Sequence, residues 1–221
     1  MNIYLESANL DEIRNAASAG LADGVAFSHV DFTADDPDAD ARERLEEISR
    51  EFAFPVCVPV GAVSSSDIYS ESRELAKVSD HIVVQIPLVE DSLVPIARLS
   101  AEGVLVCATF VFNAAQAMIA AKAGATSVRV TLDDLETYGQ SGARTLAEIK
   151  SILEAGEREC DVMAASPRSA VQFADCALAG ADIISLTPAA LRGLVVHPLS
   201  DRGVDKFLSD LARRPKPRTP A

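Results

Sequence analysis

Short apolar runs alternate along the whole chain with stretches in which apolar residues recur at helical spacing. The short runs are rich in Val, Ile and Ala and carry few charges, which is typical of parallel strands buried on both faces. Eight of these runs are predicted as strands: NIYLES (2–7), GVAFSH (24–29), PVCVPV (55–60), HIVVQIPL (81–88), VLVCATFV (104–111), SVRVTL (127–132), DVMAAS (161–166) and DIISLTP (182–188).

The stretches between the runs have the amphipathic pattern of surface helices. We expect helices near 11–28, 38–52, 65–79, 90–102, 113–123, 142–157, 169–179 and 189–196, and a final one over 203–214. Glycines stand just past several of them, where a left-handed residue commonly ends a helix. These glycines are Gly20, Gly103, Gly124 and Gly180. We expect one domain over 1–212 and a flexible tail over 213–221.

Eight repeats of a strand followed by a helix favour a closed sheet. Parallel strands joined by helical crossovers either open into a doubly wound sheet or close into a barrel, and eight evenly spaced units favour closure. A dinucleotide-binding Rossmann sheet is disfavoured, because no GxGxxG follows the first strand and no P-loop is present. The sequence therefore predicts an α/β fold, a single (β/α)8 TIM barrel with an extra C-terminal helix.

Charge and composition restrict the partners. The net charge is −13 and the pI is about 4.6, so phosphate backbones and anionic lipids are repelled and we expect neither nucleic acid nor membrane as a partner. A small anionic substrate stays compatible, because salt screens distant charges beyond about 8–10 Å. The N-terminus has acidic residues instead of a basic leader, and no apolar run reaches the roughly 18 residues of a membrane span, which predicts a cytoplasmic protein.

The four cysteines are widely separated and form no CxxC pair. We therefore expect reduced thiols and no zinc knuckle. They are Cys57, Cys107, Cys160 and Cys176.

The chemistry of a TIM barrel lies at the C-terminal ends of its strands. Period-two alternation puts residues of like parity on one face, so Glu6, Pro59, Gln85 and Cys107 are expected to point into the barrel together. Gln85 is unusual, because it is an amide within an apolar run. The other candidates at the strand ends are Ser28, His29, Thr109, Arg129, Ser166 and Arg168.

Four longer stretches carry a resemblance. They read NIYLESANLDEI, AQAMIAAKAGA, MAASPR and LVVHPLSDRGVDKF, and the last contains HP-x-x-D-x-G. In length, order and spacing, over about residues 1–212, the chain resembles the short branch of the transaldolase family, which includes fructose-6-phosphate aldolase. The resemblance implies a TIM barrel that acts on phosphorylated sugars, and we expect no cofactor.

The chemistry of that family relies on a lysine of the fourth strand, which forms a Schiff base with the substrate carbonyl. The matching position here is Gln85, and an amide nitrogen is not nucleophilic, so the usual mechanism is closed to this residue. The other lysines lie on predicted helices or in the tail. They are Lys77, Lys122, Lys150, Lys206 and Lys216.

Further positions depart from the family pattern. The first-strand aspartate of the family is Glu6 here, the second-strand asparagine is Ser28, and an asparagine of the fifth strand is Cys107, whereas Thr109 is retained. The third-strand Glu or Gln, which helps to hold the catalytic water, is Pro59, and proline donates no hydrogen bond.

Ser166 and Arg168 match the phosphate-binding serine and arginine of the family, at the start of the seventh helix, where free N–H groups favour an anion. A guanidinium can hold a phosphate bidentately. The alternative is that Ser166 is a helix cap and Arg168 a surface residue. The sixth strand is shorter than in the family, and Arg129 takes the position of a serine near the family's phosphate-contacting arginine.

Three interpretations of the altered pocket follow. Glu6 and Arg129 are expected to form a buried pair that replaces the cation lost with the lysine. Glu6 could act as a general acid or base, with Gln85 and Thr109 orienting a hydroxyl or carbonyl. A metal held by Glu6, His29, Cys57 and Cys107 is disfavoured, because they come from four strands without a local ligand motif.

Function classes stay open at this point. The favoured one is a divergent enzyme that binds a phosphorylated sugar or related metabolite and performs acid–base lyase or isomerase chemistry, because the substituting residues include Glu, Cys, His and Arg. One alternative is a catalytically inactive homologue that serves as a binding or assembly component. Another is an ordinary transaldolase or aldolase with an unrecognised lysine. The resemblance also implies a homo-oligomer, a pentamer or decamer, with the C-terminal helix reaching a neighbour.

Overall fold

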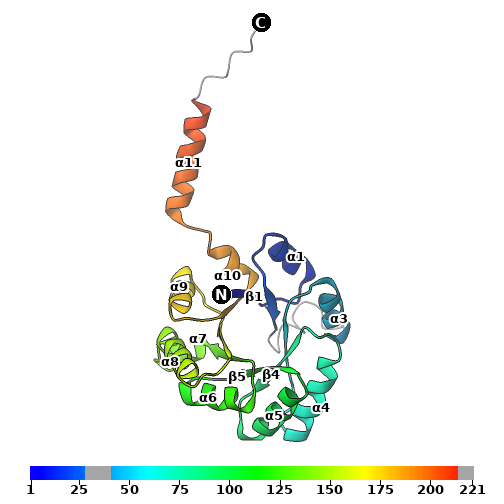
Figure 1. Ribbon diagram of the computed structural model, residues 1–221. Helices are drawn as coiled ribbons and strands as arrows, with labels where there is room; N and C mark the ends of the chain where they lie inside the picture. Colours follow the sequence, from blue (N-terminus) through cyan, green and yellow to red (C-terminus); the bar gives the residue numbers. More distant parts are fainter. Residues whose placement is uncertain (28–40, 214–221) are drawn as a thin grey trace.

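Eight parallel strands close into a barrel in the order of the chain, as predicted. The computed structural model describes residues 1–27 and 41–213, and Figure 1 shows the helices surrounding the strands. The strands are β1 Asn2–Leu5, β2 Gly24–Ala26, β3 Val56–Pro59, β4 Ile82–Pro87, β5 Leu105–Thr109, β6 Ser127–Thr131, β7 Asp161–Ala165 and β8 Ile183–Leu186.

The helices follow the strands, and several begin at a side chain that accepts a hydrogen bond from the first turn, such as Asn9, Ser64 and Ser169. A short 3-10 helix, η1 (Glu90–Ser92), precedes α5. The helices are α1 Leu10–Ser18, α3 Ala41–Glu51, α4 Ser65–Ala76, α5 Leu93–Ala101, α6 Ala114–Ala123, α7 Leu132–Thr137, α8 Gly142–Ala155, α9 Ala170–Leu178, α10 Pro188–Gly193 and α11 Pro198–Ala212.

Two helix boundaries and one additional helix differ clearly from the prediction. The first helix ends at Ser18 instead of 28, because Gly20 turns the chain with φ 67° and β2 then pairs with its neighbours. The short helix α7 was not predicted, and α11 begins at Pro198 instead of 203, since proline is well tolerated in a first helical turn. Of the helix predicted over 38–52, positions 38–40 lie outside the described residues.

Strand alternation divides the buried side chains into two groups, as period two requires. The residues that face outward pack against the helices in the main core. Inward residues nearer the N-terminal ends of the strands form a separate cluster. It consists of Tyr4, Ala26, Cys57, Val83, Cys107, Met163 and Ile183. In the register of the sheet, Pro59 pairs with Gln85 and Gln85 with Cys107, so these side chains share the inner face as predicted.

Gly24, the first residue of β2, is required by the close approach of Tyr4. A Cβ at this position would lie 2.6 Å from Cε1 of the tyrosine ring, which is itself packed in the inner cluster. The tyrosine ring can therefore occupy the inner cluster only because β2 starts with a glycine.

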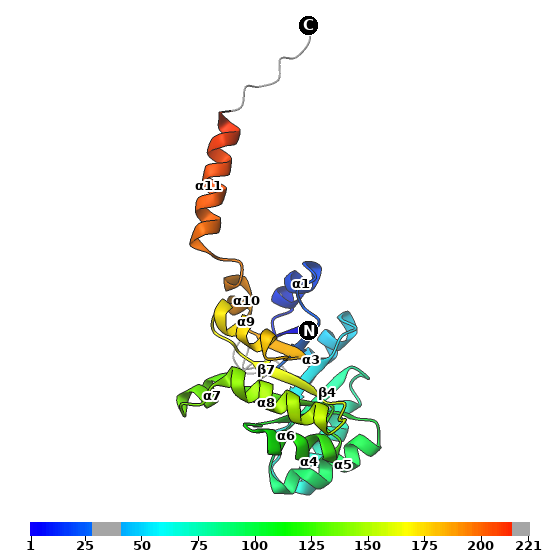
Figure 2. The same cartoon turned by 60° about the vertical axis from the view of Figure 1, so that its left-hand side comes forward.

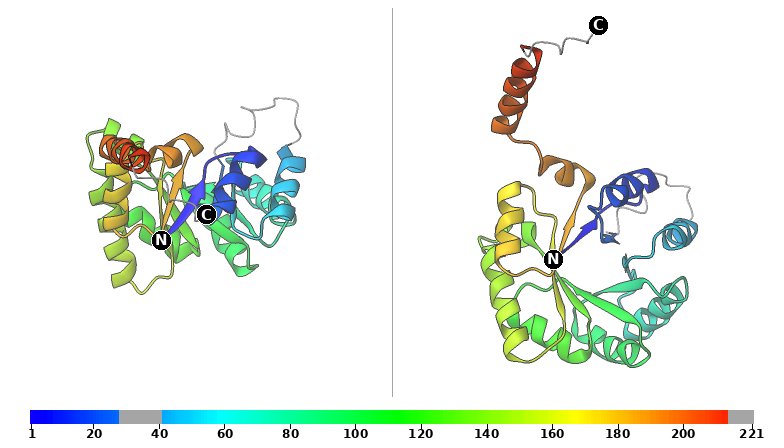
Figure 3. Two further views of the ribbon diagram at one scale, coloured as in Figure 1. Left: turned by 90° about the horizontal axis from the view of Figure 1, so that it is seen from above. Right: turned by 45° about the horizontal axis from the view of Figure 1, so that its top comes forward.

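The last helix, α11, extends away from the barrel. Figures 1 and 2 show it beyond α10, and so does the right-hand view of Figure 3. None of its residues is buried. Within residues 1–27 and 41–213, no helix is long and apolar enough to cross a membrane.

Candidate active site at the strand ends

A central cavity of about 290 Å³ opens at the C-terminal ends of the strands. This is the end of the barrel at which TIM-barrel enzymes carry their chemistry. The cavity is lined by Phe27, Pro59, Gln85, Thr109, Phe110, Arg129, Thr131, Asp134 and Ser166.

Glu6 and Arg129 form the buried ion pair that the sequence predicted. Arg129 Nη2 lies 3.0 Å from Glu6 Oε1, and the two side chains are 13% and 8% exposed. Two hydroxyls also donate to the carboxylate: Ser166 Oγ lies 2.9 and 2.8 Å from its two oxygens, and Ser185 Oγ lies 2.6 Å from Oε1. A charge this far from water is tolerated because it has both a cation and hydrogen-bond donors around it.

Gln85 is held on the other side of the same guanidinium. Its Oε1 accepts from Arg129 Nη1 at 3.0 Å, and its Nε2 donates to the carbonyl oxygen of Phe27 at 2.8 Å. The side chain is 2% exposed, so both halves of the amide satisfy buried partners. Arg129 Nε is buried without a hydrogen-bond partner among the described residues. Glu6, Arg129 and Gln85 are therefore connected by hydrogen bonds, and the two serine hydroxyls extend the network. The Glu6 network below means Glu6, Arg129, Gln85, Ser166 and Ser185.

The lysines of the described residues lie away from both the central cavity and the adjoining one described below. Lys77 is the C-cap residue of α4 and pairs with Glu74, and Lys150 on α8 pairs with Asp182 at 2.6 Å. Asp182 directly precedes β8, at the opposite end of the barrel from the cavity. Lys122 and Lys206 lie on α6 and α11, and Lys216 is outside the described residues.

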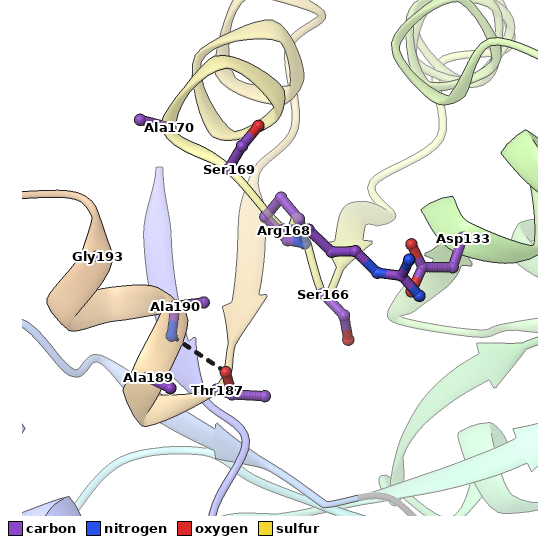
Figure 4. A pocket seen from close by; sticks show the side chains of 10 residues that line it. Asp133, Ser166, Arg168, Ser169, Ala170, Thr187, Ala189, Ala190 and Gly193 are labelled. Carbon is purple, nitrogen blue, oxygen red and sulfur yellow. Dashed lines mark hydrogen bonds and ion pairs between the residues drawn. The ribbon is translucent and has the colours of Figure 1, made fainter.

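A second cavity, of about 520 Å³, adjoins the central one at Ser166, which lines both. Figure 4 shows it between the starts of α9 and α10, with the Arg168 guanidinium directed toward Asp133. These two side chains form an ion pair at 2.6 Å, and that of Arg168 is 74% exposed. The cation is thus accessible to a ligand, but a ligand anion must compete with Asp133 for it.

Ser169, and not Ser166, is the residue that caps α9. Its side chain accepts from the N–H of Gln172, and the helix begins at Ala170. The alternative in which Ser166 is a helix cap is therefore wrong. Ser166 instead directly follows β7, and its hydroxyl donates to Glu6, 160 positions away in the sequence.

Two residues of the central cavity have left-handed backbones. Ser166 has φ 58° and Phe110 has φ 57°, and each directly follows a strand. Non-glycine residues adopt this conformation at a cost of about 1 kcal/mol or more, and such strain gathers at functional sites. Here it turns both residues toward the cavity at the point where the strands end.

Cys57 and Cys107 lie below the cavity in the inner cluster and do not line it. Burial raises the pKa of both thiols, which keeps them neutral. Within the described part of the chain, no group of three or more His, Cys, Asp or Glu residues is placed to hold a metal ion. Two predicted candidates, Ser28 and His29, lie outside the described residues, whereas Pro59 and Thr109 both line the cavity.

Sequence reasoning missed several residues of the site. Asp133 and Asp134 open α7, and Phe110 directly follows β5. All three stand just beyond a strand end, so the rule that found the other candidates could have included them. Phe27 could not have been found in this way, because it contributes its carbonyl oxygen and not its side chain to the Glu6 network.

Comparisons with known proteins agree along nearly the whole chain. The family model for transaldolase/fructose-6-phosphate aldolase matches residues 41–215. A probable transaldolase of Parvibaculum lavamentivorans is 36% identical over 217 residues, which cover 95% of this chain and 96% of the relative. Probable transaldolases of Bartonella tribocorum and Kosmotoga olearia are 36% and 33% identical, each over 95% of this chain and 96% and 95% of their own lengths.

The Glu6 network generates a prediction about stability. Arg129→Met should destabilise the protein by about 3–5 kcal/mol, because it leaves the Glu6 carboxylate buried without its cation. The double variant Glu6→Gln with Arg129→Met should recover at least about 1 kcal/mol, since contacting residues are not additive. Urea unfolding at neutral pH measures both. Arg144→Met, which breaks an exposed pair with Glu148, is the control and should change little. Glu6→Gln is also measured alone. If the free-energy changes of the two single variants add up to that of the double variant, the pairing is contradicted.

Proposed function

The chain belongs to the transaldolase/fructose-6-phosphate aldolase family, and on this premise we propose that it binds a phosphorylated sugar across the two adjoining cavities and acts on it without a Schiff base. The reaction class is acid–base chemistry next to a carbonyl, as in a lyase or an isomerase. The proposal rests on Gln85, which faces the centre of the barrel. The resemblance to the family implies that Gln85 occupies the position of the family's lysine.

A Schiff base needs an amine beside the substrate carbonyl. Gln85 offers only an amide, and both of its polar atoms are engaged with Arg129 and Phe27. The described residues that line the two cavities include no lysine. The resident cation of the central cavity is the guanidinium of Arg129, which is not a nucleophile and cannot condense with a ketone. These facts favour non-covalent activation of the carbonyl.

Ser166 connects the Glu6 network to the ligand space. Glu6 itself does not line either cavity, but its hydrogen-bond donor Ser166 lines both. In the proposed reaction, the Ser166 oxygen takes a proton from the carbon next to the substrate carbonyl while its own proton passes to Glu6. The electron pair of the broken C–H bond moves onto the carbonyl oxygen, where Arg129 would stabilise the negative charge. Ser166 then returns the proton to the former carbonyl carbon and regains its own proton from Glu6, while the proton of the neighbouring substrate hydroxyl passes to the oxyanion, so that this hydroxyl becomes the new carbonyl and the isomerisation is complete.

The phosphate end of the substrate is assigned to the second cavity. Arg168 is exposed there, and the N-terminus of α9 adds free N–H groups and a favourable dipole. Because the cavities meet at Ser166, a sugar phosphate with its phosphate near Arg168 extends past Ser166 into the central cavity. Binding of the anion would replace Asp133 as the partner of Arg168.

A second candidate function is that of a binding component without catalysis. It is favoured by the saturation of Glu6, whose two oxygens already accept from Arg129, Ser166 and Ser185. In this case the ion pair and its hydrogen bonds hold the barrel interior together and take no part in a reaction. Turnover of any sugar phosphate in a panel that is lost in Ser166→Ala supports the enzyme. Binding of a sugar phosphate without turnover supports this second candidate.

Reductive trapping tests the absence of Schiff-base chemistry. Incubation with fructose 6-phosphate and borohydride should leave the mass of the protein unchanged, because no amine of the site forms an iminium. Intact-mass spectrometry makes the measurement, and a variant with Gln85→Lys provides the control for detection of an adduct. A stable adduct on the wild-type chain would overturn the proposal.

The phosphate assignment predicts the effect of one arginine. Arg168→Ala should weaken binding of sugar phosphates about tenfold or more, because a charge-assisted contact with the anion is lost. Isothermal calorimetry with fructose 6-phosphate gives the dissociation constants. Arg144→Ala removes a similarly exposed charge that lines neither the central nor the second cavity, and it should leave the dissociation constants unchanged. Equal affinity in wild type and Arg168→Ala would remove this residue from the site.

We also propose that the protein is a homo-oligomer, a pentamer or decamer, held together in part by α11. The helix presents an exposed apolar face at the spacing i, i+3, i+4 and i+7, formed by Val204, Phe207, Leu208 and Leu211. A helix of this kind that extends from its own barrel needs another surface to cover it, and a second copy supplies one.

The oligomer proposal predicts a change in molecular mass. Phe207→Glu should yield smaller species in light scattering or sedimentation, because a charge is buried at the contact. Ser209→Glu adds the same charge on the polar side of α11 and should leave the mass unchanged. A wild-type monomer at micromolar concentration would contradict the proposal.

A further inference from the structure

A third cavity, of about 250 Å³, adjoins the central one beside α7. The two share Asp134 in their linings, as the first two share Ser166. The third cavity is lined by Phe112, Asp134, Leu135, Tyr138 and Gln140. Its position makes it a continuation of the ligand space that begins at Arg168.

Asp134 gives this region a negative charge. Within the described residues, its carboxylate has no hydrogen bond or ion pair, whereas the neighbouring Asp133 holds Arg168. The central cavity has one cationic residue in its lining, Arg129, and its charge is already balanced by Glu6. A ligand group beside Asp134 therefore meets an uncompensated carboxylate, which favours hydrogen-bond donors and repels anions.

Aromatic side chains line the two cavities that share Asp134. Phe110 lines the central cavity and is 50% exposed, and Tyr138 lines the third cavity and is 83% exposed. Phe112 is the third ring of the group. The C–H face of a sugar packs on aromatic rings while its hydroxyls donate to a carboxylate, and pockets of this type combine an apolar lining with a few polar groups.

From this arrangement we infer that the third cavity is a subsite for the hydroxylated, uncharged end of a sugar monophosphate, and that Asp134 excludes a second phosphate. The inference rests on the proposed function, because it places the single phosphate at Arg168. The ligand then has its anionic end in the second cavity, its carbonyl in the central cavity and its hydroxyls at Asp134. Asp134 is a specificity-determining residue in this arrangement.

A purely structural role for Asp134 has its own physical basis. Asp133 and Asp134 lie in the first turn of α7, where a negative charge stabilises the free N–H groups of the helix. That role would affect the stability of the protein but not its choice between ligands. The two roles are therefore separated by measuring both quantities on one variant.

The test compares a monophosphate with a bisphosphate. Calorimetry with fructose 6-phosphate and fructose 1,6-bisphosphate is carried out on the full-length wild type, on Asp134→Asn and on Asp91→Asn. Asp91 lies in η1, after β4, so its substitution removes the same charge from the same end of the barrel without touching a cavity. The urea midpoint of each variant is measured alongside.

We expect the wild type and Asp91→Asn to prefer the monophosphate by about tenfold or more. In Asp134→Asn the bisphosphate should bind at least about fivefold more tightly than in the wild type, and the preference should shrink accordingly. An unchanged preference in Asp134→Asn overturns the subsite, whether or not the urea midpoint moves. The wild type could also bind both ligands equally well, with monophosphate binding lost in Arg168→Ala. That result overturns the subsite but leaves the proposed function standing. Failure of both ligands to bind overturns the proposed function and the subsite with it.

Discussion

Glu6 places a negative charge inside a parallel barrel, and the site is arranged around the need to balance it. A carboxylate that is 8% exposed is stable only with a cation and hydrogen-bond donors in contact with it. Arg129 supplies the charge at 3.0 Å, and the hydroxyls of Ser166 and Ser185 supply the remaining donors. The guanidinium then has to be satisfied in turn, which gives Gln85 its role, because an amide oxygen accepts from Arg129 while the amide nitrogen reaches Phe27.

This network explains how a glutamine is accommodated at the centre of the barrel. A cationic side chain at position 85 would repel Arg129, whereas the neutral amide links the arginine to the backbone of Phe27, which directly follows β2. The cation of this network is Arg129 on β6. A guanidinium binds and polarises oxygen atoms but does not add to a carbonyl.

In the proposed binding mode, the cavities divide the recognition of a ligand among three places. Arg168 and the start of α9 suit an anion, the centre offers Arg129, Thr109 and Ser166 to polar groups, and Asp134 offers a carboxylate. Each boundary between cavities is a single residue at the end of β7 or the start of α7. The strained backbone of Ser166 matters here, because it lets one short side chain face Glu6 and two cavities.

The sequence by itself determined the eight strand–helix units, the closure of the sheet and the parity that turns Gln85 and Cys107 inward, because these follow from local periodicity. It also identified Glu6 and Arg129 as partners, since an inward carboxylate requires a cation. The end of α1, the helix α7 and the true cap of α9 were decided by strand pairing and local turns that the apolar pattern does not encode.

Only the tertiary structure decided that Ser166 serves Glu6 instead of a helix, that Arg168 meets Asp133 and that Asp134 joins two cavities. These contacts link residues as far apart as 160 positions, and their geometry depends on how the closed barrel brings distant strand ends together.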